Sequence, residues 1–182
     1  MDGSLLLWMT LATSLFWGVG VFNRLMRMRA RGLSALGSVE KHMRLYADLV
    51  REQVTLRDPG VAHGRPEHSP DQWDRLLLAL QTLEQVLRDD RARTLVNEPL
   101  ALLADAFDGV QTAWRQLHDV PPDLAGPIVP VALHAQWEAV AQRVETARGG
   151  FNEILTKYNE ALEQFPARLV VGSMGFKPGG KL

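Results

Sequence analysis

The sequence contains no cysteine, and its 182 residues carry a formal net charge of only −1. Without cysteine the chain can form no disulfide, use no thiolate in catalysis and build no cysteine-ligated zinc site, although this does not identify a compartment. A charge balance near zero gives no general attraction to nucleic acid, which we therefore do not expect as a partner. The informative features must then lie in the local distribution of charged and apolar residues.

Catalytic motifs are also missing. The sequence has no phosphate-binding glycine loop, no G-x-S-x-G, no H-E-x-x-H and no Glu-x-x-His. His63 and His68 could bind a metal, but no carboxylates accompany them at ligand spacing, so we interpret them as part of a solvated loop. We expect no catalytic residue, no metal site and no cofactor, and we predict that the protein is not an enzyme.

Charged residues are absent from Gly3 to Asn23, a run long enough to cross the hydrocarbon core of a bilayer as a helix of about 30 Å. Trp8 and Trp17 lie towards its two ends, where amphipathic rings favour the membrane interface. A cleaved signal peptide is the alternative. It fits less well because no basic residue precedes the run and no A-x-A-like site follows it. We interpret residues 1–23 as a retained transmembrane anchor.

A collar of four arginines follows the run at once: Arg24, Arg27, Arg29 and Arg31. The positive-inside rule places such a collar in the cytoplasm, so we expect the amino terminus outside and the rest of the chain inside. The same arginines could bind anionic lipid, at about 1 kcal/mol each.

The strongest periodic signal is a heptad-like stripe in the last third of the chain. Apolar residues recur there at alternating spacings of four and three: Leu133, Trp137, Val140, Val144, Ala147, Phe151, Ile154, Tyr158, Ala161 and Phe165. This spacing predicts a helix over residues 131–165, packed along its whole length against other helices. Similar stripes predict helices over 24–57, 70–93 and 98–118, the first continuous with the anchor. Proline- and glycine-rich loops separate them.

Four amphipathic helices in one chain predict an all-α fold, an antiparallel four-helix bundle over residues 24–165. The long first and fourth helices form its spine, and the shorter middle pair covers only part of it. Phe165 then lies at the membrane-facing end. Gly149 and Gly150 interrupt the fourth helix off the stripe, which indicates either close approach of a neighbouring helix, the interpretation we favour, or a bend.

Residues 166–182 form an irregular carboxy-terminal tail that we expect at the membrane-facing end of the bundle. It mixes glycine and proline with a few apolar residues and two lysines: Leu169, Val170, Val171, Met174, Phe176, Lys177 and Lys181. We favour a lid folded over the open end of the bundle. Contact with the bilayer interface is the alternative, and the two are compatible.

Asn152 and Asn159 lie seven residues apart on one face of the fourth helix. Asparagine is a poor helix former, so its repetition beside an apolar stripe indicates hydrogen bonds to a neighbouring helix. This region resembles the LemA family, which typically shows Ala-Arg-x-x-Tyr-Asn, then Tyr-Asn, Phe-Pro and Gly-Phe. The matching residues are Ala147, Arg148, Phe151, Asn152, Tyr158, Asn159, Phe165, Pro166, Gly175 and Phe176. Further matches near the start include Phe22, Asn23, Leu25, Arg29, Ala35, Val39 and Glu40. The resemblance implies a bacterial membrane protein with one anchor, a helical bundle and no agreed activity.

Charge is partitioned along the chain. Residues 24–51 hold seven basic and two acidic residues, whereas residues 52–165 hold ten basic and eighteen acidic ones. Our leading hypothesis is a scaffold in the bacterial inner membrane that binds a partner protein, or a second copy of itself, along the acidic, partly uncovered side of the spine. The alternative is a bilayer-organising or homo-oligomeric membrane assembly acting through the anchor, the collar and the apolar tail.

Overall fold

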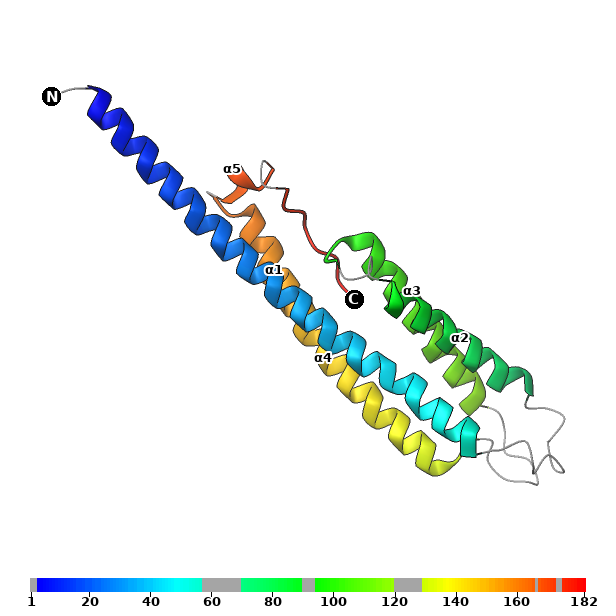
Figure 1. Cartoon of the computed structure of the whole chain (residues 1–182). Helices are drawn as coiled ribbons and strands as arrows, with labels where there is room; N and C mark the ends of the chain where they lie inside the picture. The colour runs from blue at the N-terminus through cyan, green and yellow to red at the C-terminus, as the bar shows by residue number, and fades with distance from the viewer. Residues whose placement is uncertain (1–2, 57–69, 90–93, 120–128, 166, 173–174) are drawn as a thin grey trace.

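The computed structural model describes residues 3–56, 70–89, 94–119, 129–165, 167–172 and 175–182. The regular secondary structure within these ranges is entirely helical, with α1 (Gly3–Leu56), α2 (Pro70–Arg88), α3 (Asn97–His118), α4 (Val131–Glu163) and the short α5 (Ala167–Val171) (Figure 1). The four long helices pack as a bundle, and the predicted all-α fold class is confirmed. His63 and His68 lie outside the described residues.

α1 runs without a break from the apolar segment into the bundle, as predicted. No proline occurs before Pro59, so nothing in its 54 residues interrupts the backbone hydrogen bonds. Its first part protrudes alone beyond the other helices, and its second part forms one side of the bundle (Figure 1). A helix of this length extends for roughly 80 Å.

Prolines mark most of the other helix boundaries. α2 begins at Pro70, and Pro130 immediately precedes α4. α2 ends at Arg88, earlier than the predicted residue 93, and Asp89 is already non-helical. Residues 90–93 and most of the loop before α4 lie outside the described residues.

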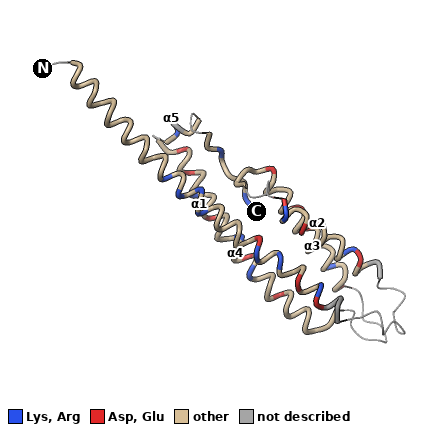
Figure 2. Tube along the Cα trace, viewed as in Figure 1, with Lys and Arg blue, Asp and Glu red and all other residues tan. Residues whose placement is uncertain are grey.

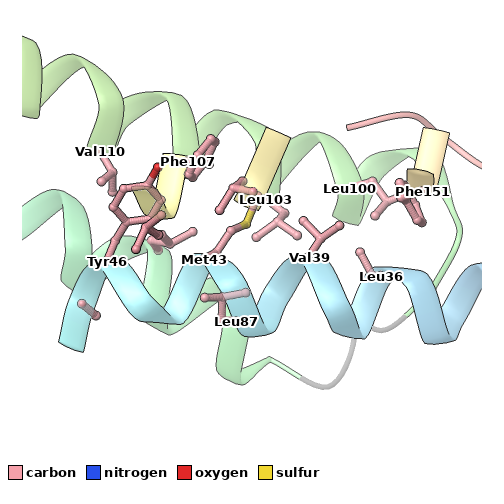
Figure 3. Close-up of a cluster of buried hydrophobic side chains, with 14 of the residues drawn as sticks. Leu36, Val39, Met43, Tyr46, Leu87, Leu100, Leu103, Phe107, Val110 and Phe151 are labelled. Carbon is pink, nitrogen blue, oxygen red and sulfur yellow. The ribbon is translucent and has the colours of Figure 1, made fainter. Parts of the chain in front are cut away.

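The helices form two closely packed pairs, α1 with α4 and α2 with α3, which share one apolar core (Figures 1 and 3). Leu36, Val39 and Met43 of α1 face Leu100 and Leu103 of α3 in this core. Farther along, aromatic rings from three helices stack together. Tyr46 lies 4.3 Å from Trp137 and 5.8 Å from Phe107, and Trp114 stacks on Trp137 at 4.0 Å between ring centroids.

The heptad stripe of α4 is correct over most of its length and wrong at its end. Its members from Leu133 to Val144, together with Phe151, Tyr158 and Ala161, are buried, but Leu155 takes the core position expected for Ile154. α4 ends at Glu163 because Gln164 turns to an extended conformation two residues before Pro166. Phe165 therefore leaves the stripe and is 81% exposed.

The favoured explanation of the Gly149–Gly150 pair is wrong. A Cβ atom added at either residue would meet open space, and α4 continues through both. The close approach occurs at Gly32 of α1 instead. A Cβ there would lie 3.0 Å from Leu95 Cδ1 and 3.5 Å from Leu155 Cδ2, so Gly32 lets the segment before α3 approach the α1–α4 pair.

Candidate functional site

The apolar first part of α1 is largely exposed in the described part of the chain. No residue of its most apolar 18-residue window is buried, and the mean hydropathy of that window is 1.8. Among the described helices, α1 is the one long and apolar enough to cross a membrane. Large side chains such as Leu15 and Phe16 project outward, at 72% and 85% exposure. This segment is compatible with a membrane anchor by length and composition.

The arginine collar begins where the other helices join α1 (Figure 2). Arg24, Arg27, Arg29 and Arg31 are all exposed. A small open hollow of about 60 Å³ lies beside Arg24, lined also by Val21, Leu25, Ala161, Gln164, Phe165 and Ala167. The end of α4 and the start of α5 therefore lie next to the base of the apolar segment.

The tail does not simply close the end of the bundle. After α5, Phe176 packs edge-to-face on Phe22 of α1, with ring centroids 5.8 Å apart. The chain then turns back along α4 as far as the start of α3 (Figure 1). Only the first half of residues 166–182 thus lies at the end where we expected all of it. Pro166, Met174 and the side chains of Leu169 and Val170 lie outside the described residues.

Asn152 and Asn159 bind the backbone of the tail, not a neighbouring helix as we predicted. Asn159 Nδ2 donates to Gly179 O at 2.9 Å, and Gly179 N donates to Asn159 Oδ1 at 2.8 Å. Asn152 binds Leu182 in the same way, at 2.7 Å and 3.0 Å. Each side-chain amide therefore satisfies the N–H and the C=O of one tail residue. We call this pair the asparagine clamp.

Two further hydrogen bonds hold the same stretch of tail. Tyr158 Oη donates to Lys177 O at 3.2 Å, and Gly180 N donates to Leu95 O at 3.0 Å. The side chain of Leu182 packs on the core. The tail thus covers the face of α4 beyond the start of α3, which was the uncovered spine that we had proposed as an interface.

Glycine is required where the tail approaches the bundle most closely. A Cβ atom on Gly179 would overlap the Leu155 side chain, and one on Gly180 would lie 2.8 Å from Asn97 Cα. Gly175, a signature residue, has φ +69°, a conformation that favours glycine. Gly175 therefore lets the chain turn, and Gly179 and Gly180 let it lie directly against α4 and the start of α3.

The remaining signature residues join α4 to its neighbours. Phe151 is fully buried, and the Arg148 guanidinium lies 5.6 Å from the centre of the Phe107 ring of α3. Arg148 also pairs with Glu145 at 2.9 Å. These contacts assign Arg148 and Phe151 to packing between α3 and α4.

Burial shifts the pKa of both tyrosines in the core. Burial raises the pKa of Tyr46 to about 12, although the hydrogen bond donated by Gln111 opposes this shift. Burial also raises the pKa of Tyr158, against the opposing charge of Arg29. Across the described part of the chain, no three His, Asp or Glu side chains gather where they could hold a metal ion.

Sequence reasoning identified the two asparagines but not what they bind. Leu95, Asn97, Gly179 and Gly180 were missed because none belongs to an apolar stripe. The Gly179–Gly180 pair was the available signal, since two adjacent glycines permit a backbone to approach another element closely.

Comparison with known proteins supports the resemblance on which the signature was based. A family model described as the LemA family matches residues 81–181. This range includes the clamp, Gly179 and Gly180, the end of α2, and the whole of α3, α4 and α5. No curated protein and no solved structure matches the chain. The match covers more than half of the sequence, and the chain therefore belongs to the LemA family.

Proposed function

We propose that this protein is a non-enzymatic scaffold anchored in the bacterial inner membrane, which holds a rigid helical bundle at the cytoplasmic face and binds a partner protein there. The continuity of α1 is the observation that carries the proposal. One helix contains an apolar segment whose most apolar window has no buried residue, then the arginine collar, then a face buried in the bundle core. Such a helix couples the position of the bundle directly to the bilayer.

The collar supports an orientation with the amino terminus outside and the bundle in the cytoplasm. Because the sequence has no cysteine, single introduced cysteines give topology data without background. We expect a membrane-impermeant maleimide to label Asp2→Cys in intact cells, since Asp2 precedes the uncharged run. Gln136→Cys, at an exposed position of the bundle, should be labelled only after permeabilisation. The reverse pattern would overturn the orientation, and recovery of the protein in the soluble fraction would overturn the anchor.

The partner surface that we propose is the outer face of α3, because the tail covers the spine. Glu98, Leu102, Asp105 and Asp108 follow one side of α3 and are all exposed, Leu102 at 58%. An exposed leucine among carboxylates suits a partner with a basic surface around an apolar pocket.

Site-specific photo-crosslinking in intact membranes tests this surface. A photoreactive residue at Leu102 should give a discrete protein adduct, and the adduct should weaken when Asp105 and Asp108 are both changed to Asn. The same probe at Gln136, exposed on α4, is the matched control. Equal labelling from both positions, or none from Leu102, would contradict the proposed surface.

A second candidate is a protein that organises the bilayer itself. The hollow beside Arg24 and the exposed Phe165 favour it, because both adjoin the base of the apolar segment. A photoreactive residue at Phe165 should then label lipid. Lipid adducts at Phe165 without protein adducts at Leu102 would favour this function over the scaffold.

A further inference from the structure

The asparagine clamp recognises an extended peptide backbone. Six backbone groups of the tail are held by other elements: Lys177 O, Gly179 N and O, Gly180 N, and Leu182 N and O. Four of the six bind the two asparagine amides, each of which pairs with one residue as a neighbouring β-strand would. These contacts are made to backbone atoms, so the hydrogen bonds themselves do not depend on the identity of the bound side chains.

The spacing of the clamp matches an extended chain. Seven helical residues from Asn152 to Asn159 span about 10.5 Å. Three extended residues from Gly179 to Leu182 span about 10 Å. The tail runs antiparallel to α4, since Gly179 binds the later asparagine and Leu182 the earlier one. The two asparagines are therefore placed to hold residues three apart on a strand.

The residues around the bound tail set two requirements for its side chains. The first is glycine at two successive positions, because Leu155 and Asn97 leave no room for a Cβ atom at Gly179 or Gly180. The second is an apolar side chain two residues later, at Leu182, which packs on the core. A chain of the form Gly-Gly-x-Leu meets both requirements, and every copy of this protein carries one.

We infer that the clamp of one copy can bind residues 176–182 of a neighbouring copy, so that tails are exchanged between molecules. This inference rests on the membrane anchoring proposed above. Anchors inserted in one direction hold all clamps at one height from the bilayer, which raises the effective concentration of neighbouring tails. Among the described residues, exchange would break the backbone hydrogen bond from Phe176 N to Val171 O at 3.3 Å, and the clamp contacts would form again in the partner. Gly175, whose φ is +69°, provides a turn directly before the exchanged residues.

Co-expression of two differently tagged full-length chains tests the exchange. The first carries a photoreactive residue at Lys181, which is exposed between the clamped Gly180 and Leu182. The second chain is the recipient and carries no probe. We expect a covalent adduct bearing both tags, with the attachment mapped near Leu95, Asn97 or Asn152 of the recipient. The internal adduct within the first chain shows that the probe reaches the clamp.

Recipient variants separate tail exchange from mere proximity. Asn152→Ala with Asn159→Ala in the recipient should lower the two-tag adduct by about tenfold or more. Gln136→Ala with Gln142→Ala, at exposed positions on the same helix, should leave it unchanged. An internal adduct without a two-tag adduct, or a two-tag adduct insensitive to the clamp, would overturn the inference. Fractionation of the same cells reports the anchor separately, so failure of anchoring and failure of exchange are distinguishable.

Discussion

At the scale of single residues, two asparagine side chains make backbone hydrogen bonds of the kind that a neighbouring β-strand usually makes. Asn159 binds both backbone groups of Gly179, and Asn152 does the same for Leu182. A side-chain amide carries a donor and an acceptor, so it can complete a peptide group without itself belonging to a sheet. This explains why two poor helix formers occur within the 33-residue helix α4.

Asn159→Ala should lower the stability of the folded chain by about 1–3 kcal/mol, because it leaves the half-buried groups of Gly179 unpaired. The better helix propensity of alanine offsets only about 0.5 kcal/mol of this loss. Thermal unfolding followed by circular dichroism measures the effect, with Gln136→Ala as the exposed control on the same helix. Equal melting temperatures for the two variants would contradict the role of the clamp.

The two tyrosines make a pH-dependent prediction. Burial raises the pKa of Tyr46 from 10.0 to about 12, and that of Tyr158 in the same direction. The folded state thus favours the neutral phenols, and the stability this provides is fully present below pH 10 and is lost as the pH rises towards 12. In a pH titration, tyrosinate absorbance should therefore appear above pH 10 and together with loss of helix.

Tyr46→Phe should reduce the alkaline destabilisation, because phenylalanine has no proton to lose. Tyr46 and Tyr158 are the only tyrosines in the sequence, so tyrosinate absorbance has no other source. Tyrosinate formation centred near pH 10 in a fully helical protein would contradict the burial of both side chains.

At the scale of elements, apolar periodicity correctly predicted which faces of the helices are buried. The stripes of α1, α3 and α4 appear in the core, because a helix that packs along one face must place apolar residues every three or four positions. The stripe could not locate the end of α4 at Glu163, since Phe165 has the right spacing and only the backbone before Pro166 excludes it. Apolar periodicity also could not predict the path of the tail, because the tail is held mainly through its backbone, which requires no periodic apolar residues.

The Gly149–Gly150 pair gives an element-scale prediction. Gly150→Ala should stabilise the chain by about 1 kcal/mol, since alanine is the better helix former and its Cβ would meet open space. Gly32→Ala is the matched contrast, because its Cβ would press on Leu95 and Leu155. Chemical denaturation of both variants measures the difference. Destabilisation by Gly150→Ala would mean that α4 bends there or meets a partner.

At the scale of the whole molecule, the most apolar part of α1 does not contribute to the bundle core, although it belongs to the same helix. None of the most apolar window is buried, whereas Val21 and Phe22 already contact the bundle or its tail. A chain beginning at Gly18 keeps both contacts. We expect it to leave the membrane fraction and to melt within a few degrees of the full chain, as followed by circular dichroism. A collapse of helical signal would show that the bundle needs the anchor to fold.

The unbroken α1 has a mechanical consequence once its first part is embedded in a bilayer. A transmembrane helix commonly tilts by about 20°, and the tilt changes with bilayer thickness. The part of α1 from the start of the collar at Arg24 to Leu56 extends for about 50 Å, so a 20° change in tilt would move its far end sideways by roughly 17 Å. A chain anchored in this way would act as a lever that converts the thickness of the membrane into the lateral position of its bundle.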